Sequence, residues 1–259
     1  MDFLSIEKVS HTYFTKESAT TAIENITLSV QDGEFVSLLG PSGCGKTTLL
    51  SIIAGLIKPT EGTVKIENKQ IEAARSLIGY MLQQDYLFPW KTIEENVLVG
   101  LKITSSLNEQ NKKNAIQLLE EIGLKGVERY YPSQLSGGMR QRAALVRTLA
   151  TNPKILLLDE PFSALDYQTK LKLEDLVSHT LKEYKKTAIL VTHDIGEAIA
   201  MSDRIVLLSA NPGKIAKTFH VPDELKHQTP FNARQHPTYS DLFQMIWKEL
   251  DSLETNQEY

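Results

Sequence analysis

A glycine-rich segment between an apolar strand and an apolar helix constrains the fold of this chain more than any other feature. The β-type run 34–39 precedes it and the helical stretch Thr48 to Leu56 follows. The G-x-x-x-x-G-K-[ST] spacing is matched by Gly40, Pro41, Ser42, Gly43, Cys44, Gly45, Lys46 and Thr47. Glycines let successive backbone N–H groups point at an anion, and the helix N-terminus adds partial positive charge. The segment therefore predicts a phosphate loop for a nucleoside triphosphate, with Lys46 on the outer phosphates and Thr47 on Mg²⁺.

An acidic pair follows the fully apolar run Ile155 to Leu158. A buried parallel strand brings its C-terminal residues to the sheet edge where open α/β sheets bind ligands, so we expect Asp159 and Glu160 beside the phosphate loop. Successive side chains on a strand point in opposite directions, so the two acids have different roles. We assign Asp159 to the Mg²⁺ shell and Glu160 to the attacking water, as a base or polarising group.

The hydrophobic pattern predicts an α/β fold in which a phosphate-loop ATPase core has a mixed sheet, an antiparallel β subdomain and an inserted α-helical subdomain. Residues 1–91 and 153–220 form the predicted ATP-binding core with its antiparallel β subdomain. Polar and apolar residues alternate at 26–30 and 64–67, which predicts half-buried antiparallel strands. From about residue 153, short apolar runs alternate with helical stretches, which is typical of a parallel sheet covered on both faces.

Two further segments complete the predicted organisation. Residues 92–152 form the helical subdomain and include the second glycine-rich segment described below, with Gly123 expected to stop a helix. One face of that helix is formed by Ala115, Leu118, Leu119 and Ile122. Residues 221–259 form a C-terminal tail with an amphipathic helix near 238–250, for which we favour core packing over partner binding.

Composition excludes several classes of protein. The net charge of -4 provides no overall basic field for nucleic acid or anionic lipid. The single cysteine, Cys44, lies in the phosphate loop, so we expect no disulfide framework or cysteine metal cluster, and a reducing cytosol fits. No run approaches eighteen apolar residues and the first residues are acidic, so we expect neither a membrane span nor secretion.

A second glycine-rich helix start lies about ninety residues after the phosphate loop, at Leu135-Ser136-Gly137-Gly138-Met139-Arg140-Gln141. Ser136, Gly137 and Gly138 precede a helical run, so this helix N-terminus also suits a γ-phosphate. Six elements follow one another along the chain in the order of one known family. They are the phosphate loop, Gln83, this segment, the acidic pair, residues 163–166 and His193. On these residues the chain resembles the ATP-binding subunit of an ABC transporter, over nearly all of residues 3–215.

The resemblance implies a partner that the residues alone do not reveal. In that family the second glycine-rich segment faces the nucleotide bound by another subunit. We therefore expect a two-fold pair of this chain with two ATP molecules at the interface. Each ATP is held by the phosphate loop of one copy and by Ser136, Gly137 and Gly138 of its mate.

Further site residues are also assigned by the resemblance. Gln83, favoured over its neighbour Gln84, ligates Mg²⁺ and orients the water, and His193 contacts the γ-phosphate. Tyr13 is similar to the aromatic residue that stacks on adenine, although His11 or Phe14 could take that part. Thr48 and Asp166 complete the expected nucleotide-binding set.

The chain departs from the family pattern at two places. Residues 146–149 read Val-Arg-Thr-Leu where Ala-Arg-Ala-Leu is usual, and Gly196 stands where an acidic residue is common. Neither position touches a phosphate, so we expect an active ATPase with ATP and Mg²⁺ as its cofactors.

The resemblance also indicates what the ATPase drives. The stretch 85–97, with Pro89 and Trp90, and residues 208–215 resemble the nitrate, sulfonate and taurine importers. Pro89 and Trp90 suit either a groove for a permease helix or internal packing. We expect an importer motor on the cytoplasmic face of the membrane, bound to permease subunits and served by an extracytoplasmic solute-binding protein, with no nucleic acid involved.

Aliphatic sulfonate or taurine is the leading solute. Nitrate, bicarbonate and a thiamine or pyrimidine precursor remain alternatives, because solute contacts belong to the permease and the binding protein. An ABC ATPase without a transport role is the other function class.

Overall fold

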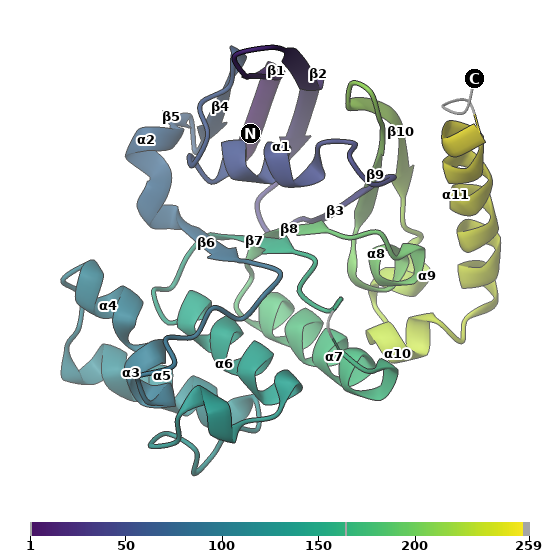
Figure 1. Cartoon of the computed structure of the whole chain (residues 1–259). Coiled ribbons are helices and arrows are strands. Elements are labelled where there is room, and N and C mark those ends of the chain that lie inside the picture. The colour runs from purple at the N-terminus through teal and green to yellow at the C-terminus, as the bar shows by residue number, and fades with distance from the viewer. Residues whose placement is uncertain (1, 164, 256–259) are drawn as a thin grey trace.

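The core of the protein is a mixed six-stranded sheet (Figure 1). The computed structural model describes residues 2–163 and 165–255. The strand order is β10 (Lys214–His220), β9 (Arg204–Ser209), β3 (Phe35–Leu39), β8 (Thr187–Val191), β7 (Ile155–Asp159) and β6 (Ile78–Met81). Neighbouring strands are parallel except β9 and β10, which pair antiparallel. Every residue of β3, β7 and β8 is buried, as the apolar runs predict for strands covered on both faces.

A second, antiparallel sheet lies at the top of Figure 1. Its order is β2 (Ala19–Val30), β1 (Leu4–Phe14), β4 (Glu61–Ile66) and β5 (Lys69–Gln70). Ile6 of β1 pairs with Leu28 on one side and Val64 on the other, so one apolar face forms across three strands. The predicted alternation is confirmed, because Ile26, Leu28 and Val30 are buried and the intervening residues are not.

Helix α1 (Lys46–Ile53) lies between the two sheets (Figure 1). Leu49, Leu50 and Ile53 of this helix share one core cluster with strands of both sheets. Helices α6 (Gly137–Leu149) and α7 (Tyr167–Glu183) cover the opposite face of the six-stranded sheet. The alternation along β7 explains the two layers: Ile155 and Leu157 face α1, whereas Leu156 and Leu158 face α6 and α7.

A helical region extends from the edge of the sheet near β6 (Figure 1). Helix α2 (Ile71–Ala74) and the 3₁₀ turn η1 (Arg75–Leu77) lead into β6. After β6 the chain forms α3 (Ile93–Val97), α4 (Val99–Ile103), α5 (Glu109–Glu121) and the 3₁₀ turn η2 (Pro132–Gln134). The predicted helix stop is confirmed at Gly123, whose φ is 76°. The domain boundaries at 91/92 and 152/153 stay predictions.

The C-terminal tail packs on the edge of the core next to α8 (Ile195–Met201). It contains α9 (Asp223–Lys226), α10 (Pro230–Ala233) and α11 (Pro237–Thr255). Helix α11 runs five residues past the predicted end, because the partly buried Leu253 continues its inner face. Leu242 and Ile246 are buried in a cluster with residues of α8 and β9, so the apolar face of α11 packs on the core.

In the part of the chain that the structure describes, no helix is long and apolar enough to cross a lipid bilayer. No group of three or more His, Cys, Asp or Glu side chains within residues 2–163 and 165–255 is arranged to hold a metal ion.

Candidate nucleotide site

The phosphate loop joins β3 to α1, as its sequence predicts. Gly45 is the residue before the helix and has a left-handed backbone with φ of 85°. A Cβ on Gly45 would lie 2.4 Å from Cγ2 of Ile23, so only glycine fits there. Helix α1 begins at Lys46, two residues earlier than the apolar stretch alone indicates, and no side chain caps its first turn. Its free N–H groups are therefore available to an anion.

A pocket of about 620 Å³ lies over this loop. Residues 42–48 line it, together with Ala22, Glu160 and His193. Lys46 is nearly buried, and its ammonium donates hydrogen bonds to the carbonyl oxygens of Gly40 (2.7 Å) and Pro41 (2.9 Å). Within residues 2–163 and 165–255, Lys46 forms no ion pair. The ammonium of Lys46 is therefore not in direct contact with a carboxylate, which leaves it available to a polyphosphate.

The thiol of Cys44 lies at the base of the loop. It is buried, with its sulfur 3.5 Å from the Lys46 ammonium. Burial raises the pKa of this thiol, which outweighs the lysine charge. Cys44 is therefore a packing residue of the loop rather than a thiolate.

Asp159 ends β7 beside the first turn of α1. Its Oδ1 accepts a hydrogen bond from the Thr47 hydroxyl at 3.2 Å, and its Oδ2 accepts one from the Tyr80 hydroxyl at 3.3 Å. Burial raises the pKa of Asp159. Burial and the neighbouring Asp159 raise the pKa of Tyr80 to about 12. The hydroxyl and the carboxylate predicted for Mg²⁺ are thus in direct contact.

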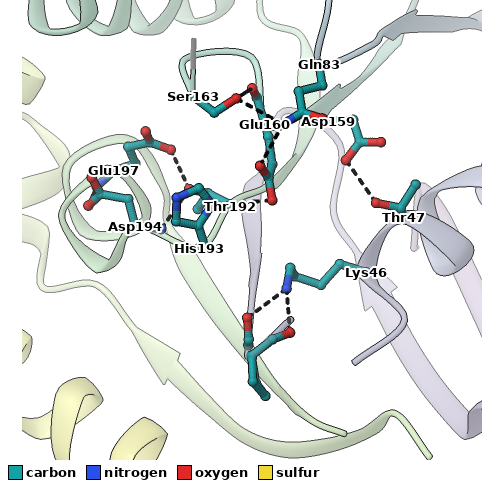
Figure 2. A network of polar contacts seen from close by, with 12 residues as sticks. Lys46, Thr47, Gln83, Asp159, Glu160, Ser163, Thr192, His193, Asp194 and Glu197 are labelled. Atoms are coloured by element: carbon teal, nitrogen blue, oxygen red, sulfur yellow. Dashed lines mark hydrogen bonds and ion pairs between the residues drawn. The ribbon is translucent and has the colours of Figure 1, made fainter. Parts of the chain in front are cut away.

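Glu160 turns away from Asp159 and toward His193 (Figure 2). Its φ is 45°, and its backbone N–H donates to the carbonyl of Val191 at 2.9 Å. The carboxylate accepts a hydrogen bond from Nε2 of Gln83 at 3.2 Å, and its other oxygen lies 3.3 Å from Nδ1 of His193. Asp159 thus faces Thr47, whereas Glu160 faces Gln83 and His193, and the roles assigned to the two acids stay predictions.

Gln83, rather than Gln84, makes the contacts to this cluster. Its amide also donates to the Ser163 hydroxyl at 3.2 Å. Gln84 is exposed, and no hydrogen bond of its side chain is found within the described part of the chain. Three segments far apart in sequence, at Gln83, Glu160 and His193, therefore meet at one edge of the pocket (Figure 2).

The remaining predicted residues lie around the pocket. The Tyr13 hydroxyl is 3.3 Å from the Thr48 hydroxyl, and the rings of Tyr13 and His11 meet edge to face at 4.6 Å. Phe14 is 72% exposed. Asp166 caps α7 by accepting a hydrogen bond from the Thr169 amide at 3.1 Å, which lowers its pKa. Neither Tyr13 nor Asp166 lines the pocket as it is formed by the described residues.

The second glycine-rich segment is not part of this pocket. Ser136 is the N-cap of α6, and its hydroxyl accepts a hydrogen bond from the Met139 amide at 3.3 Å. Ser136 and Gly137 are exposed. Gly138 is buried, and a Cβ there would lie 2.5 Å from Cγ2 of Thr169. Within one chain, the described structure therefore does not bring residues 136–138 together with the phosphate loop.

Comparison with known proteins identifies the family and the fold. The family model described as ABC transporter matches residues 23–163. The chain belongs to the ABC transporter family. The predicted resemblance and the predicted α/β fold class are both confirmed. The chain is an ATP-binding ABC subunit and an ATPase.

Several relatives of this ABC ATPase match it along most of its length. An uncharacterized ABC transporter ATP-binding protein, YtlC of Bacillus subtilis (strain 168), is 63% identical and covers 99% of each chain. The aliphatic sulfonates import ATP-binding protein SsuB of Bacillus licheniformis is 41% identical over 96% of this chain and 94% of the relative. A dimeric structure of the ATP-binding cassette MJ0796, in a post-hydrolysis state bound to ADP and Pi, is 35% identical. It has a TM-score of 0.75 and covers 85% of this chain and 99% of its own.

The structure of the ABC ATPase also shows two residues beside the site to which the sequence alone assigned no role. Tyr80 contacts Asp159 from the neighbouring strand β6. Gln141 of α6 is buried, and its amide donates to the carbonyls of Gln83 (3.0 Å) and Pro161 (3.1 Å). Tyr80 could have been recognised because its hydroxyl group lies within an otherwise apolar strand. For Gln141 the signal was a glutamine on the inner face of an amphipathic helix.

Proposed function

We propose that this chain is the ATP-hydrolysing, energy-coupling subunit of an importer for aliphatic sulfonates or taurine-like solutes. It pairs with a second copy around two MgATP and drives uptake through a separate membrane permease, to which it binds at the cytoplasmic face. The observation that carries the proposal is the contact of the Glu160 carboxylate with both Gln83 and His193 at the edge of the phosphate-loop pocket.

These three residues have complementary roles in hydrolysis. Glu160 is the base, or the polarising group, for the water that attacks the γ-phosphate. Gln83 is an amide donor that orients the carboxylate and the water. His193 is 65% exposed and faces the pocket, where its imidazole reaches the γ-phosphate. Lys46 and the N-terminus of α1 stabilise the negative charge on the phosphates.

The residues at the base of the pocket fit a magnesium ion. Mg²⁺ prefers oxygen ligands and binds through one or two carboxylates together with substrate phosphates. Asp159 supplies a carboxylate whose raised pKa reflects burial, and Thr47 supplies a hydroxyl in contact with it. The amide oxygen of Gln83 is the third candidate ligand. When bound, the ion neutralises charge on the phosphates during transfer.

Two observations support a paired assembly. Ser136 and Gly137 begin a helix of thirteen residues, yet they lie outside the pocket of their own chain. The related cassette MJ0796 has been solved as a dimer. In a two-fold pair, each of these helix starts faces the γ-phosphate held by the mate, so both sites are completed by the same contact.

The loop after Gln83 supports binding to a permease. The rings of Phe88 and Trp90 lie 5.5 Å apart, and Trp90 is 71% exposed. The loop beneath them is rigid, because the buried Asn96 accepts a hydrogen bond from the Phe88 amide at 2.7 Å and donates to the Phe88 and Lys91 carbonyls. An exposed aromatic pair on a fixed loop suits an interface with another protein better than internal packing.

Reconstitution in liposomes tests the proposal. The chain is combined with a candidate permease and a candidate solute-binding protein, and ATP hydrolysis is measured with taurine, an alkanesulfonate, nitrate, bicarbonate and a thiamine precursor. We expect a sulfonate-loaded binding protein to stimulate hydrolysis several-fold. Stimulation by another solute would show that the assigned solute is wrong. A chain that hydrolyses ATP and never co-purifies with the permease would instead be an ABC ATPase without a transport role.

A further inference from the structure

The C-terminal tail reaches the loop that carries His193. Helices α10 and α11 both pack on α8, and α10 also packs on α7 (Figure 1). Ala233, Leu242 and Ile246 of the tail share a buried cluster with Ile195 and other residues of α8. Helix α8 begins two residues after His193, so the tail is packed against the support of a predicted active-site residue.

The conformation of the His193 loop depends on the start of α8. Asp194 caps this helix, with Oδ1 accepting hydrogen bonds from the amides of Gly196 (2.6 Å) and Glu197 (3.1 Å). The Thr192 hydroxyl accepts from the Asp194 amide at 3.0 Å and donates to the Glu197 carboxylate. His193 is therefore held between two residues that are both fixed by the first turn of α8 (Figure 2).

Lys170 of α7 fixes the same turn from the other side. Its ammonium lies 2.6 Å from Oδ2 of Asp194 and 2.6 Å from Oε1 of Glu197. Lys170 is 16% exposed. Burial lowers the pKa of this ammonium, but hydrogen bonds to the two carboxylates outweigh it and the pKa is raised. The ammonium is therefore a cross-link from α7 to the cap of α8.

One turn along α7, the carboxylate of Glu174 is completely buried. Nη2 of Arg234, from the tail, lies 2.7 Å from its Oε2. Within the described residues, Oε1 of Glu174 has no hydrogen-bond partner. The cluster thus has three carboxylates, at Glu174, Asp194 and Glu197, against two cations. The charges of Arg234 and of Lys170 both lower the pKa of Glu174, against the effect of its burial.

Gly196 provides the space into which the tail fits. A Cβ at this position would lie 2.8 Å from the Tyr239 hydroxyl, 3.0 Å from Oδ1 of Asp194 and 3.9 Å from Nε of Arg234. An acidic side chain, which is common at this position in the resembled family, would therefore require the Tyr239 side chain to move. The absence of a side chain at Gly196 of α8 thus makes room for the Tyr239 hydroxyl of α11.

We propose that Arg234 and Tyr239 of the tail are positioning residues for His193. They act through the first turn of α8 and through the charge balance around Lys170, a role that rests on the proposed function of His193. Without Arg234, the buried Glu174 loses the cation in contact with it, which raises its pKa further. The ion pair that ties α10 to α7 is also lost, so the tail supports the cap that orients the His193 loop less firmly. A displacement of about 1 Å in a reacting group can reduce turnover about 10²-fold.

Steady-state hydrolysis by the purified chain tests this role. For Arg234→Met and for Gly196→Ala we expect kcat to fall about 10- to 100-fold, while KM and the affinity of a fluorescent ATP analogue change less than about two-fold. Nucleotide affinity is retained because the phosphate loop lies on α1, away from the tail. Adding Tyr239→Phe to Gly196→Ala removes the hydroxyl that the new methyl meets, so we expect it to restore part of kcat.

A matched control removes a different ion pair of the same tail. Lys217 pairs with Glu249 of α11 and does not belong to the α7–α8 cluster, so Lys217→Met is expected to leave kcat unchanged. Folded variants of Arg234 and Gly196 with wild-type kcat would overturn the positioning role. So would an equal loss of kcat and nucleotide affinity, because that indicates general unfolding. If His193→Ala itself has wild-type kcat, the proposed function of His193 is wrong, and that result is distinct from failure of the tail variants alone.

Discussion

The two glycine-rich helix starts of this protein look alike in sequence and differ in structure. The first, residues 40–47, lies inside a pocket with a lysine and the acidic pair nearby. The second, residues 135–141, has a serine N-cap and an exposed Gly137, and it lies outside that pocket. A helix N-terminus attracts phosphate in both cases, but only the first has the surrounding groups of a complete site.

The difference shows which parts of the ATPase act within one chain. The groups that we propose to hold nucleotide and to activate water, from Lys46 to Glu160 and His193, lie together within a single chain. The second helix start does not line the pocket formed by the described residues, so we expect it to bind phosphate only when another molecule brings one to it. We therefore expect variants of the two regions to differ in whether they retain ATP binding within their own chain.

The largest expected effect comes from the complete site. Glu160→Gln keeps the shape of the side chain and its position beside Gln83, but removes the group that accepts a proton from water. We expect kcat to fall by about 10²–10⁴-fold and ATP affinity to stay within a few-fold of wild type. Phosphate release and equilibrium binding of nucleotide are measured on the same preparation.

A matched control is Glu183→Gln, which changes an exposed carboxylate of α7. It should hydrolyse ATP at the wild-type rate. Equal rates for wild type and Glu160→Gln would remove Glu160 from the mechanism. Because Glu160→Gln retains ATP, it should also remain paired under saturating MgATP, and a variant that stays a monomer in light scattering contradicts the proposed assembly.

The next effect separates the two helix starts. Gly137 tolerates a side chain, since a Cβ there meets no atom closer than 4.0 Å, and a carboxylate in the first turn favours the helix. Gly137→Glu should therefore fold well and bind ATP through its own phosphate loop. It should lose about 10²-fold in kcat, because the new charge repels the γ-phosphate held by the mate. Lys46→Ala, in contrast, should lose ATP binding.

Mixing these two inactive proteins provides the sharper measurement. A mixed pair has one site with both defects and one site in which the intact phosphate loop meets an intact second segment. In an equal mixture half of the pairs are mixed, so about a quarter of the wild-type rate should return. A mixture of Lys46→Ala with the double variant contains no intact site and is the control. Failure of the first mixture to regain activity would show that residues 135–141 do not complete a neighbour's site.

Sequence alone predicts the residues whose arrangement is determined by their immediate neighbours in the chain. Lys46 and Thr47 follow from one loop, and the separation of Asp159 from Glu160 follows from the alternation of a strand. The apolar strands and the helix end at Gly123 likewise depend only on short stretches of sequence. Tyr80 and Gln141 were missed, because their contacts depend on which strands and helices become neighbours.

The contacts of the C-terminal tail also could not be predicted from the sequence. Its helix was predicted, but the contact of Arg234 with Glu174 joins residues sixty positions apart. Gly196 could be recognised as a departure from the family pattern, yet its reason is the Tyr239 hydroxyl in the structure. Pattern and spacing indicate an amphipathic face, whereas the partner of that face is decided by tertiary packing.

The smallest expected effect is on the pH dependence of stability, and it comes from Glu174, which contacts Arg234 of the C-terminal tail. Burial raises the pKa of Glu174 to about 7, with Arg234 opposing the shift. A carboxyl with a raised folded pKa binds its proton more tightly in the folded state, so stability falls as pH rises from about 4.5 to about 7. The contribution is on the order of 3 kcal/mol across that window. Glu174→Gln removes it, because the amide does not titrate.

Thermal unfolding at pH 5, 6, 7 and 8 measures this effect. All other titrating groups are shared, so the difference between the two melting curves isolates Glu174. We expect wild type to lose several degrees more than Glu174→Gln between pH 5 and pH 8, with most of the change completed by about pH 7. Glu183→Gln, on the exposed face of α7, should follow wild type. Parallel curves for wild type and Glu174→Gln would mean that Glu174 is already ionised at pH 5 beside Arg234. The charge balance around Lys170 would then be independent of pH, and the tail would support the His193 loop through a permanently ionised cluster.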